Sequence, residues 1–195
     1  ADATAIPVQA VCEPFAAPRL LVANLPYNVA ATLVLRMFEE LPELEAATVM
    51  VQAEVADRMS AEPGGKAYGA YSVKLQLLAS PQSRFKVPPG CFMPPPRVDS
   101  AVIRLVRHGA WTDAGDLASA RAAADAAFAQ RRKTIANSLA SALGADRSSV
   151  EKNLLEAGID PKRRAETLTV AEYVLLGKRL RYAGLLPCRG AKPLV

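Results

Sequence analysis

The sequence predicts an α/β fold over residues 1–108 followed by a small all-α domain over residues 109–195. In the first region, short apolar runs of strand length alternate with segments of helical apolar spacing. In the second region the strand signals stop, and helical spacing and helix-capping residues take over. The charge divides near the same place, because residues 1–110 carry 10 Lys+Arg and 10 Asp+Glu, whereas the rest of the chain carries 14 and 9.

The elements of the first region follow from apolar runs and breakers. The run at 20–23 is continuously apolar and predicts a buried strand, and Pro63-Gly64-Gly65 stops a short helix. In order, the expected elements are a strand at 20–23, a helix at 30–41, a strand at 48–52, a helix at 53–60, a helix at 71–79, a strand at 83–87, a loop at 88–96 and a strand at 101–106.

The second region is predicted to be a small helical bundle. Segments 148–151 and 169–172 have the Ser/Thr-x-x-Glu form of a capping box, and Gly144 suits the end of a helix. The last ten residues indicate a loose tail. The expected helices run from Asp113 or Asp116 to about residue 130, over 134–143, near 149–157 and over 170–182.

The tetrapeptide Asn24-Leu25-Pro26-Tyr27 directly follows the first apolar run. It therefore lies at the carboxyl end of a strand, where open α/β sheets bind ligands. Its Asn-x-Pro-Tyr form resembles the active-site motif of methyltransferases that act on the exocyclic amine of adenine. The Asn24 oxygen and a neighbouring backbone carbonyl can each accept one N–H of that amine, and an aromatic ring can stack on the base. The alternative is an ordinary turn between a strand and a loop.

A second motif, Phe-x-Pro-x-Pro-x-Val-Asp-Ser-x-Val, spans residues 92–102. Prolines restrict the backbone, so this loop can hold Phe92 as a second stacking surface opposite Tyr27. A Pro-rich surface loop before an edge strand is the alternative, but it gives no reason for the aromatic residue. Neighbouring Cys91 is expected to pack in the interior and not to act as a nucleophile.

Together these motifs resemble the KsgA family of ribosomal RNA adenine dimethyltransferases. Asn28 extends the first motif as in that family. Three further segments agree with the family pattern, namely 51–58 (Val-Gln-Ala-Glu-Val-Ala-Asp-Arg), 66–73 (Lys-Ala-Tyr-Gly-Ala-Tyr-Ser-Val) and 128–134 (Phe-Ala-Gln-Arg-Arg-Lys-Thr). At Tyr71 the family usually has Leu.

The resemblance implies the C-terminal part of a Rossmann-like S-adenosylmethionine-dependent methyltransferase sheet, ending in an antiparallel hairpin. It implies that Asn24 and the Leu25 carbonyl orient the N6 amine, that Pro26 holds the turn, and that Tyr27 and Phe92 sandwich the base. The reaction would be dimethylation of two adjacent adenines near the 3′ end of small-subunit rRNA. Glu54 would be structural.

The cofactor half of the fold is expected to be missing. No Gly-x-Gly occurs in the sequence, although such a turn usually binds S-adenosylmethionine. The resemblance assigns Asp2 to the cofactor's adenine and brings Asn24 close to the cofactor as well. The simplest interpretation is an N-terminally truncated chain lacking on the order of a hundred residues. Whether that part was cleaved, not cloned or not encoded stays open.

The net charge of +5 lies entirely in the second region, which favours an anionic polymer as partner. The expected partners are small-subunit rRNA and the immature 30S subunit, although a solvated helical surface would also account for a modest charge. The candidate RNA-binding residues are Arg131, Arg132, Lys133, Lys162, Arg163, Arg164, Lys178, Arg179 and Arg181.

Three alternatives to this function remain. An Erm-type enzyme would methylate large-subunit rRNA, and a ribosome-assembly factor would bind the immature subunit without depending on catalysis. A DNA adenine methyltransferase shares the first motif but not the second. We expect a cytoplasmic protein with no membrane segment and no metal, because no apolar run is long enough to span a bilayer and the three cysteines lack metal spacing.

Overall fold

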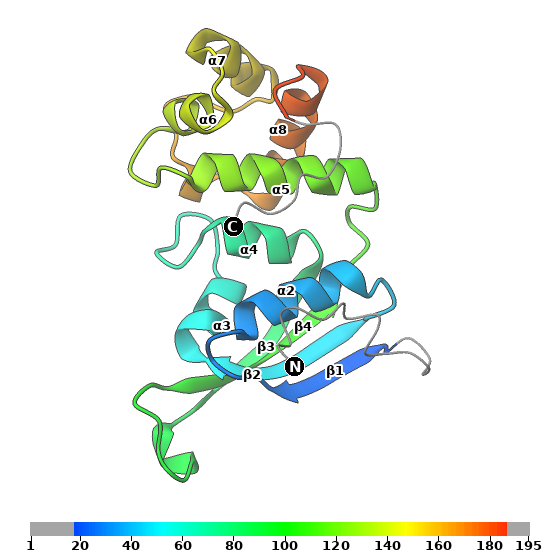
Figure 1. The fold of residues 1–195 in the computed structure, drawn as a ribbon, viewed down its shortest axis with the longest axis vertical. Coiled ribbons are helices and arrows are strands. Elements are labelled where there is room, and N and C mark those ends of the chain that lie inside the picture. Colours follow the sequence, from blue (N-terminus) through cyan, green and yellow to red (C-terminus); the bar gives the residue numbers. More distant parts are fainter. Residues whose placement is uncertain (1–17, 187–195) are drawn as a thin grey trace. The chain divides into compact units, whose positions relative to one another are not determined.

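The computed structural model describes residues 18–186, which divide into two compact units. One unit contains residues up to Ser60 together with Leu78–Gly109, and the other contains Ala61–Leu77 and the chain from Ala110 onward. The first is a sheet with helices and the second is helical, which confirms the predicted α/β fold with an added helical part (Figure 1). The expected loose tail lies almost wholly outside the described residues.

The first unit is built on a four-stranded sheet of order β1-β2-β4-β3. Strand β1 pairs in parallel with β2, while β4 is antiparallel to both β2 and β3. The antiparallel end of the sheet agrees with the expectation from the family resemblance. The elements are β1 Leu20–Asn24, α2 Ala30–Glu40, β2 Ala46–Gln52, α3 Ala53–Met59, β3 Ala79–Val87, the 3-10 turn η1 Pro89–Cys91 and β4 Ser100–Arg107.

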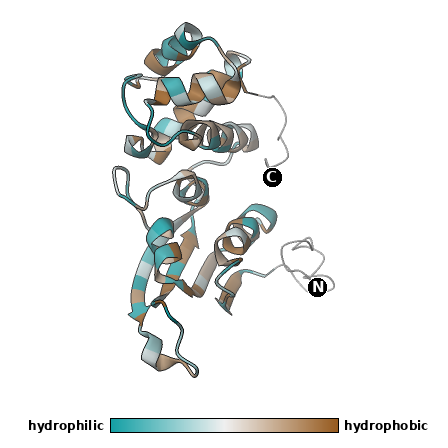
Figure 2. Ribbon diagram, turned by 60° about the vertical axis from the view of Figure 1, so that its left-hand side comes forward, coloured by the Kyte–Doolittle hydropathy of each residue, from teal (hydrophilic) through white to brown (hydrophobic). Residues whose placement is uncertain are grey.

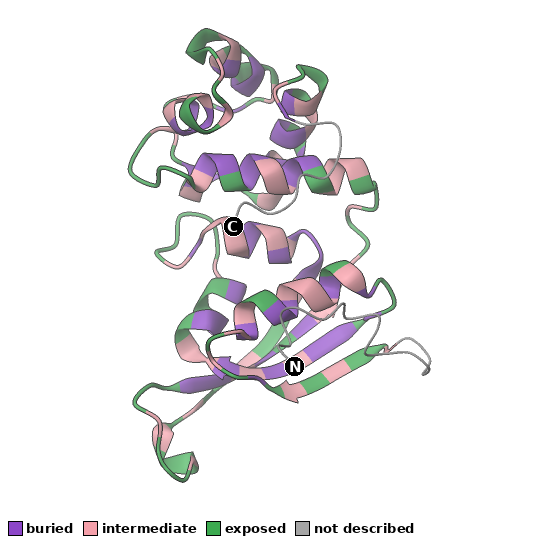
Figure 3. Cartoon of the chain, in the orientation of Figure 1, coloured by how far each residue is buried: buried purple, intermediate pink, exposed green. Residues whose placement is uncertain are grey.

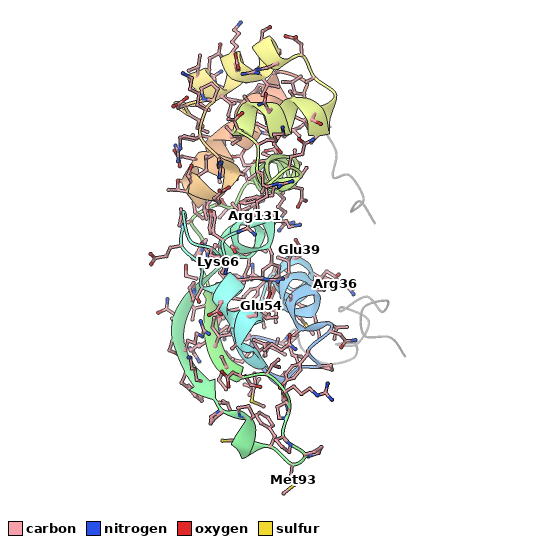
Figure 4. The ribbon with its side chains drawn as sticks, turned by 90° about the vertical axis from the view of Figure 1, so that its left-hand side faces the viewer. Arg36, Glu39, Glu54, Lys66, Met93 and Arg131 are labelled. Carbon is pink, nitrogen blue, oxygen red and sulfur yellow. The ribbon has the colours of Figure 1, made fainter. Side chains whose placement is uncertain are left out.

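Helices α2 and α3 cover one face of this sheet, and no described helix of the unit lies on the other face (Figures 1 and 4). The covered face contains Val49 and Ile103, which are fully buried. On the opposite face, Leu20 is 62% exposed and Val22 is 81% exposed. The predicted strand at 20–23 is therefore correct in position but wrong in burial, because the described residues supply helices to one face only (Figure 3).

Two of the expected boundaries in this part of the chain were wrong. The helix expected over 71–79 is α4, Ala70–Gln76, and the strand expected at 83–87 already begins at Ala79. Pairing with β4 explains the longer strand, since Ala79 lies opposite Arg107 in the ladder. Long-range strand pairing thus extends β3 into residues whose local pattern favoured a helix.

The second unit packs α4 together with the C-terminal helices. Tyr68, just before α4, contacts the Phe128 ring edge-on, and Phe128 stacks on Tyr173, with ring centroids 6.2 Å and 6.1 Å apart. Burial raises the pKa of Tyr68 to about 12, so the cluster stays uncharged. This packing groups residues 61–77 with the helices, whereas the sequence division placed them in the first region. The other elements are α5 Ala114–Phe128, α6 Ile135–Leu143, α7 Arg147–Glu156, the 3-10 turn η2 Ala165–Thr167 and α8 Val170–Tyr182.

The helix ends in this unit follow the expected capping residues with one exception. Asp113 caps α5, Gly144 ends α6 with a φ of 60°, and Thr169 forms the capping box that opens α8. The capping box expected at 148–151 is wrong, because Asp146 caps α7 by accepting the backbone N–H of Ser149 at 3.1 Å. The Asp146 carboxylate therefore occupies the capping position, two residues before Ser148, and a negative charge is favourable at a helix N-terminus.

Helices α5 and α8 approach each other closely at Gly177. A Cβ atom at this position would lie 2.5 Å from the Ala120 backbone nitrogen. Most of the buried residues of α5 are alanines. Figure 2 colours the ribbon by the hydropathy of each residue. Small side chains on both helices therefore set the distance between them. No helix among residues 18–186 is long and apolar enough to cross a membrane.

We expect Gly177→Ala to lower the free energy of unfolding by about 1–3 kcal/mol through overpacking against the α5 backbone. In an unconstrained helix the same change would raise the free energy of unfolding by up to about 1 kcal/mol. The sign of the measured change therefore shows whether α5 and α8 are in close contact. Urea unfolding measures it. Gly109→Ala is the control, since no heavy atom lies within 4 Å of its added Cβ. A stabilised Gly177→Ala variant would contradict the close contact.

Candidate functional site

The candidate site lies where four strand ends meet at one edge of the sheet. Strands β1 and β2 run in parallel and end there at Asn24 and Gln52. Strand β4 is antiparallel to them and begins at the same edge with Ser100, opposite Gln52. Strand β3 ends there as well, because Val87 also lies opposite Ser100. Both sequence motifs are therefore brought to one edge by the strand directions.

Asn24 and Leu25 present hydrogen-bond acceptors at this edge that no group within residues 18–186 occupies. The Leu25 N–H donates to the Met50 carbonyl at 3.2 Å, which extends the β1–β2 ladder by one residue. Among residues 18–186, neither the Asn24 side chain nor the Leu25 carbonyl has a hydrogen-bond partner. The Asn24 side chain is exposed, whereas the Leu25 side chain is buried and anchors the turn. Two unpaired acceptors on adjacent residues can receive the two N–H groups of one amine.

Pro26 connects the strand end to helix α2. Its carbonyl accepts the backbone N–H groups of Val29 and Ala30, at 3.2 Å and 3.0 Å. The carbonyl of Pro26 is thus used to start the helix, while that of Leu25 stays available. Helix α2 is anchored by its buried face, which includes Val34 and Phe38. The turn is consequently held at both ends by buried structure.

Tyr27 is tied to the second motif by a hydrogen bond. Its hydroxyl lies 2.7 Å from the Oγ of Ser100, and the Ser100 side chain is fully buried. The bond joins residues 73 positions apart in the chain and fixes the direction of the phenol ring. A separate bond ties the second motif to the junction of β2 and α3, from the Ala53 N–H to the Asp99 carbonyl at 2.9 Å. The two motifs thus form one structural unit.

Phe92 lies on the loop between β3 and β4. Its N–H donates to the Pro89 carbonyl at 3.1 Å, which closes the η1 turn, and its side chain is partly exposed. Its predicted position opposite Tyr27 stays a prediction. Cys91 is exposed, so the expectation that it packs in the interior is wrong. The loop leaves the sheet, and its residues have no layer above them in which to be buried.

Two further residues of the first region have expected roles, Asp2 as a cofactor contact and Glu54 as a structural residue. Asp2 lies outside the described residues. Glu54 sits in the first turn of α3 and forms an ion pair with Arg58, one turn further along, so it is engaged within the helix. In the described part of the chain, no group of three or more His, Cys, Asp or Glu residues is arranged to hold a metal ion.

Four of the nine candidate RNA-binding residues form ion pairs within the second unit. Arg163 pairs with Glu172 and donates to the Thr167 carbonyl at 2.7 Å. The other three cations are on α8, where Lys178 and Arg181 pair with Asp116 and Arg179 pairs with Glu156. Burial alone would raise the pKa of Glu172, but hydrogen bonds from Arg163 and Thr169 bring that pKa below its ordinary value. These contacts hold helices and turns together.

The other five basic candidates belong to two loops, 129–134 and 157–164, which are hydrogen-bonded to each other and to the loop that carries Lys66. The Arg131 guanidinium donates to the Lys66 carbonyl at 2.6 Å, and the Ile135 N–H donates to the Arg163 carbonyl at 2.7 Å. The Gly64 N–H donates to the Glu166 carbonyl at 2.6 Å. Figure 4 shows Lys66 and Arg131 close together. We call the exposed cations of these loops the basic cluster; they are Lys66, Arg131, Arg132, Lys133, Lys162 and Arg164.

The sequence of this chain matches a known family over most of its length. Residues 12–181 match the family described as ribosomal RNA adenine dimethylase. The chain belongs to this family. The ribosomal RNA small subunit methyltransferase A of Rhodococcus opacus is 46% identical over 162 residues, which cover 82% of this chain and 54% of that protein. The protein of the same name from Rubrobacter xylanophilus is 45% identical over 163 residues, covering 84% and 60%. The chain thus spans little more than half the length of these curated relatives.

Solved structures support the fold. The crystal structure of a dimethyladenosine transferase from Plasmodium falciparum aligns with a TM-score of 0.76 at 20% identity, covering 90% of this chain and 71% of that one. The crystal structure of the 23S rRNA methyltransferase ErmE aligns with a TM-score of 0.64 at 25% identity, covering 87% and 68%. These likenesses confirm the Rossmann-like fold class that the sequence predicts.

Methyltransferases of the dimethylase family generally use S-adenosylmethionine. Of the two residues predicted to contact this cofactor, the described chain contains Asn24, whose exposed amide is unpaired within residues 18–186 and can bind a polar group. The Gly-rich turn is absent from the sequence. Among residues 18–186, Asn24 therefore has a group that fits the predicted cofactor contact, and this assignment stays a prediction.

Sequence reasoning missed two residues of the site. Ser100 was part of the second motif, but no local signal indicated that its hydroxyl meets Tyr27, because that contact depends on strand pairing. Lys66 was noted only as part of a family segment. The Lys66 carbonyl accepts a hydrogen bond from Arg131, so Lys66 joins the basic cluster. The two residues are close because their loops pack together.

We expect Tyr27 and Ser100 to be energetically coupled. Tyr27→Phe leaves the buried Ser100 hydroxyl without its partner and should cost about 1–3 kcal/mol of unfolding free energy. Tyr27→Phe combined with Ser100→Ala should cost less than the sum of the two single changes, because neither polar group is then left unpaired. Urea unfolding of the four proteins gives the coupling energy. Additive costs would argue against the bond.

We expect Arg163→Ala to destabilise the protein by about 2 kcal/mol, since it removes charged hydrogen bonds to Glu172 and Thr167. Lys162→Ala, at an exposed neighbour, is the control and should change stability little.

The lowered pKa of Glu172 means that its ionised form favours the folded state. The destabilisation by Glu172→Gln should therefore be complete at neutral pH and shrink as pH falls below 4.5, the ordinary pKa of the group. A cost independent of pH would contradict the pairing.

Proposed function

We propose that this chain is the substrate-side part of an enzyme that dimethylates the N6 amines of two adjacent adenines near the 3′ end of small-subunit rRNA. The observation that carries the proposal is a pair of acceptors beside the tethered ring of Tyr27. They are the Asn24 amide oxygen and the Leu25 carbonyl, and both are unpaired within the described residues 18–186. Membership of the ribosomal RNA adenine dimethylase family supports the substrate class, and the small-subunit names of its curated relatives support the choice of subunit.

The two acceptors act by orientation. The lone pair of the adenine amine is delocalised into the ring, which makes the amine a weak nucleophile. When Asn24 and Leu25 each accept one N–H, the lone pair is directed out of the ring plane along a defined line. S-adenosylmethionine supplies the methyl group when it is bound. A strong base is unnecessary, because the methylated amine can lose its proton to solvent.

The aromatic residues hold the base. Tyr27 is fixed by Ser100, and in this proposal Phe92 closes on the opposite face of the adenine, so that the base is stacked between two rings. Pro26 keeps the acceptors in register by linking the strand end to α2. Because the Asn24 turn and Tyr27 are positioned by buried neighbours, this side of the site needs little rearrangement when the base enters.

The basic cluster binds the RNA backbone. Its six cations are exposed, whereas the ion-paired Arg163, Lys178, Arg179 and Arg181 hold the helical unit together. We therefore assign phosphate binding first to the cluster. Contacts of this kind recognise charge and shape more than base sequence. The immature 30S subunit in the cytoplasm is the proposed partner, with the sheet unit as the catalytic part and the helical unit, which includes Ala61–Leu77, as the RNA-binding part.

The test is transfer of labelled methyl groups to undermethylated ribosomal subunits by the complete product of the gene that encodes this chain. We expect label on two adjacent adenines of the small subunit, and a rate about 10²–10³ lower for Asn24→Ala, the range for losing one oriented polar contact to the reacting group. Asn137→Ala, on α6, is the matched control. Binding should weaken steeply with salt.

Other outcomes would select the alternatives. Label on large-subunit rRNA would favour the Erm-type reaction, to which the likeness to ErmE gives some weight. Subunit binding without label, unaffected by Asn24→Ala, would favour an assembly factor. Unchanged methylation by Asn24→Ala would contradict the assigned role of the acceptor pair.

A further inference from the structure

Met93 is the most exposed of the described large apolar side chains. Its side chain is 95% exposed, and it directly follows Phe92 on the loop between β3 and β4. Figure 4 shows it at the tip of this loop, away from the sheet. Keeping a methionine in water forgoes the burial free energy of a large apolar side chain. An apolar group in this position is therefore suited to contact with a partner.

The loop that carries Met93 has a constrained backbone. The Cys91 N–H donates to the Pro88 carbonyl at 3.0 Å, and the Phe92 N–H donates to the Pro89 carbonyl at 3.1 Å. Three consecutive prolines, at 94–96, follow the methionine and restrict its backbone on that side. Met93 is thus held in place from both sides, which reduces the entropy lost when it is inserted into a partner.

The charge around the loop favours an anionic partner. From residue 84 to the start of β4, the chain contains three basic residues and one acidic residue, Asp99. Arg84 is paired with Asp57 at 2.6 Å, but Lys86 and Arg97 are exposed. An apolar tip flanked by exposed cations matches a nucleic acid, whose phosphates attract the cations and whose stacked bases receive the apolar group. A purely apolar protein surface would not need the cations.

We propose that Met93 is a wedge that enters the RNA base stack and fills the space left by the target adenine when that base leaves the stack. The inference rests on the proposed function and adds to it a residue that promotes extrusion of the base. Adenine extrusion costs unstacking free energy. Burial of the methionine side chain against the flanking base offsets part of this cost, while Phe92, its neighbour, contacts the extruded base.

The test uses 2-aminopurine, whose fluorescence rises when it loses stacking with neighbouring bases. It is placed next to the target adenine in an RNA that spans the 3′ region of small-subunit rRNA, and the complete gene product is added. We expect fluorescence to rise with the wild type. Met93→Ala should lower the extruded fraction and kcat about 10-fold, since burying such a side chain is worth at least that factor. Its RNA affinity should change much less.

Two variants make the result specific. Met93→Leu keeps an apolar side chain of similar size and should restore the fluorescence and kcat. Leu155→Ala removes an exposed apolar side chain from α7, in the other unit, and should change neither. Far-ultraviolet circular dichroism of each variant checks that it is folded.

The outcomes separate this inference from the proposed function. Normal methyl transfer and an unchanged fluorescence response in Met93→Ala would overturn the wedge while the proposed function stands. Equal losses of affinity and of extrusion in Met93→Ala would also overturn it, because Met93 would then be a general contact with RNA or with a subunit protein. If the wild type transfers no methyl groups to undermethylated ribosomal subunits, both proposals fail.

Discussion

The direction of β4 is the constraint on which the candidate site depends. Because β4 lies antiparallel between β2 and β3, it begins at the edge where β1 and β2 end. That edge receives the Asn24 turn and the Phe92 loop, which come from distant parts of the chain. The bond between Tyr27 and Ser100 is possible only in this arrangement, and it joins the two segments into one rigid surface. A parallel β4 would leave Ser100 at the opposite edge of the sheet.

Polar groups at this edge divide into those that build the structure and those that are left for a ligand. The Pro26 carbonyl starts α2, the Leu25 N–H extends the β1–β2 ladder, and the Tyr27 hydroxyl is bonded to Ser100. Within residues 18–186, the Asn24 amide and the Leu25 carbonyl remain unpaired. Buried polar groups are almost always paired, so acceptors that the fold leaves unpaired are the ones a ligand can satisfy. The helical unit shows the same distinction. Its ion-paired arginines hold the structure together, whereas the cations of the basic cluster are left for a ligand.

The differences between expectation and structure have a common cause. The apolar run at 20–23 predicted burial on both faces, but the described helices cover only one. The helical pattern at 71–79 was cut short by the ladder between β3 and β4. The basic residue Arg163 proved to be held by Glu172. In each case a neighbour that local sequence does not reveal decided the result.

By itself, the sequence determined the order of the elements, most of the helix caps and the chemical character of the two motifs. These features depend on residues a few positions apart, such as the apolar spacing of α2 or the Thr169 capping box. Only the tertiary structure decided that Tyr27 meets Ser100, that Lys66 joins the basic cluster, and which cations remain exposed. Those outcomes depend on strand direction and on packing between residues far apart in the chain, where many pairings are compatible with the same local pattern and burial selects among them.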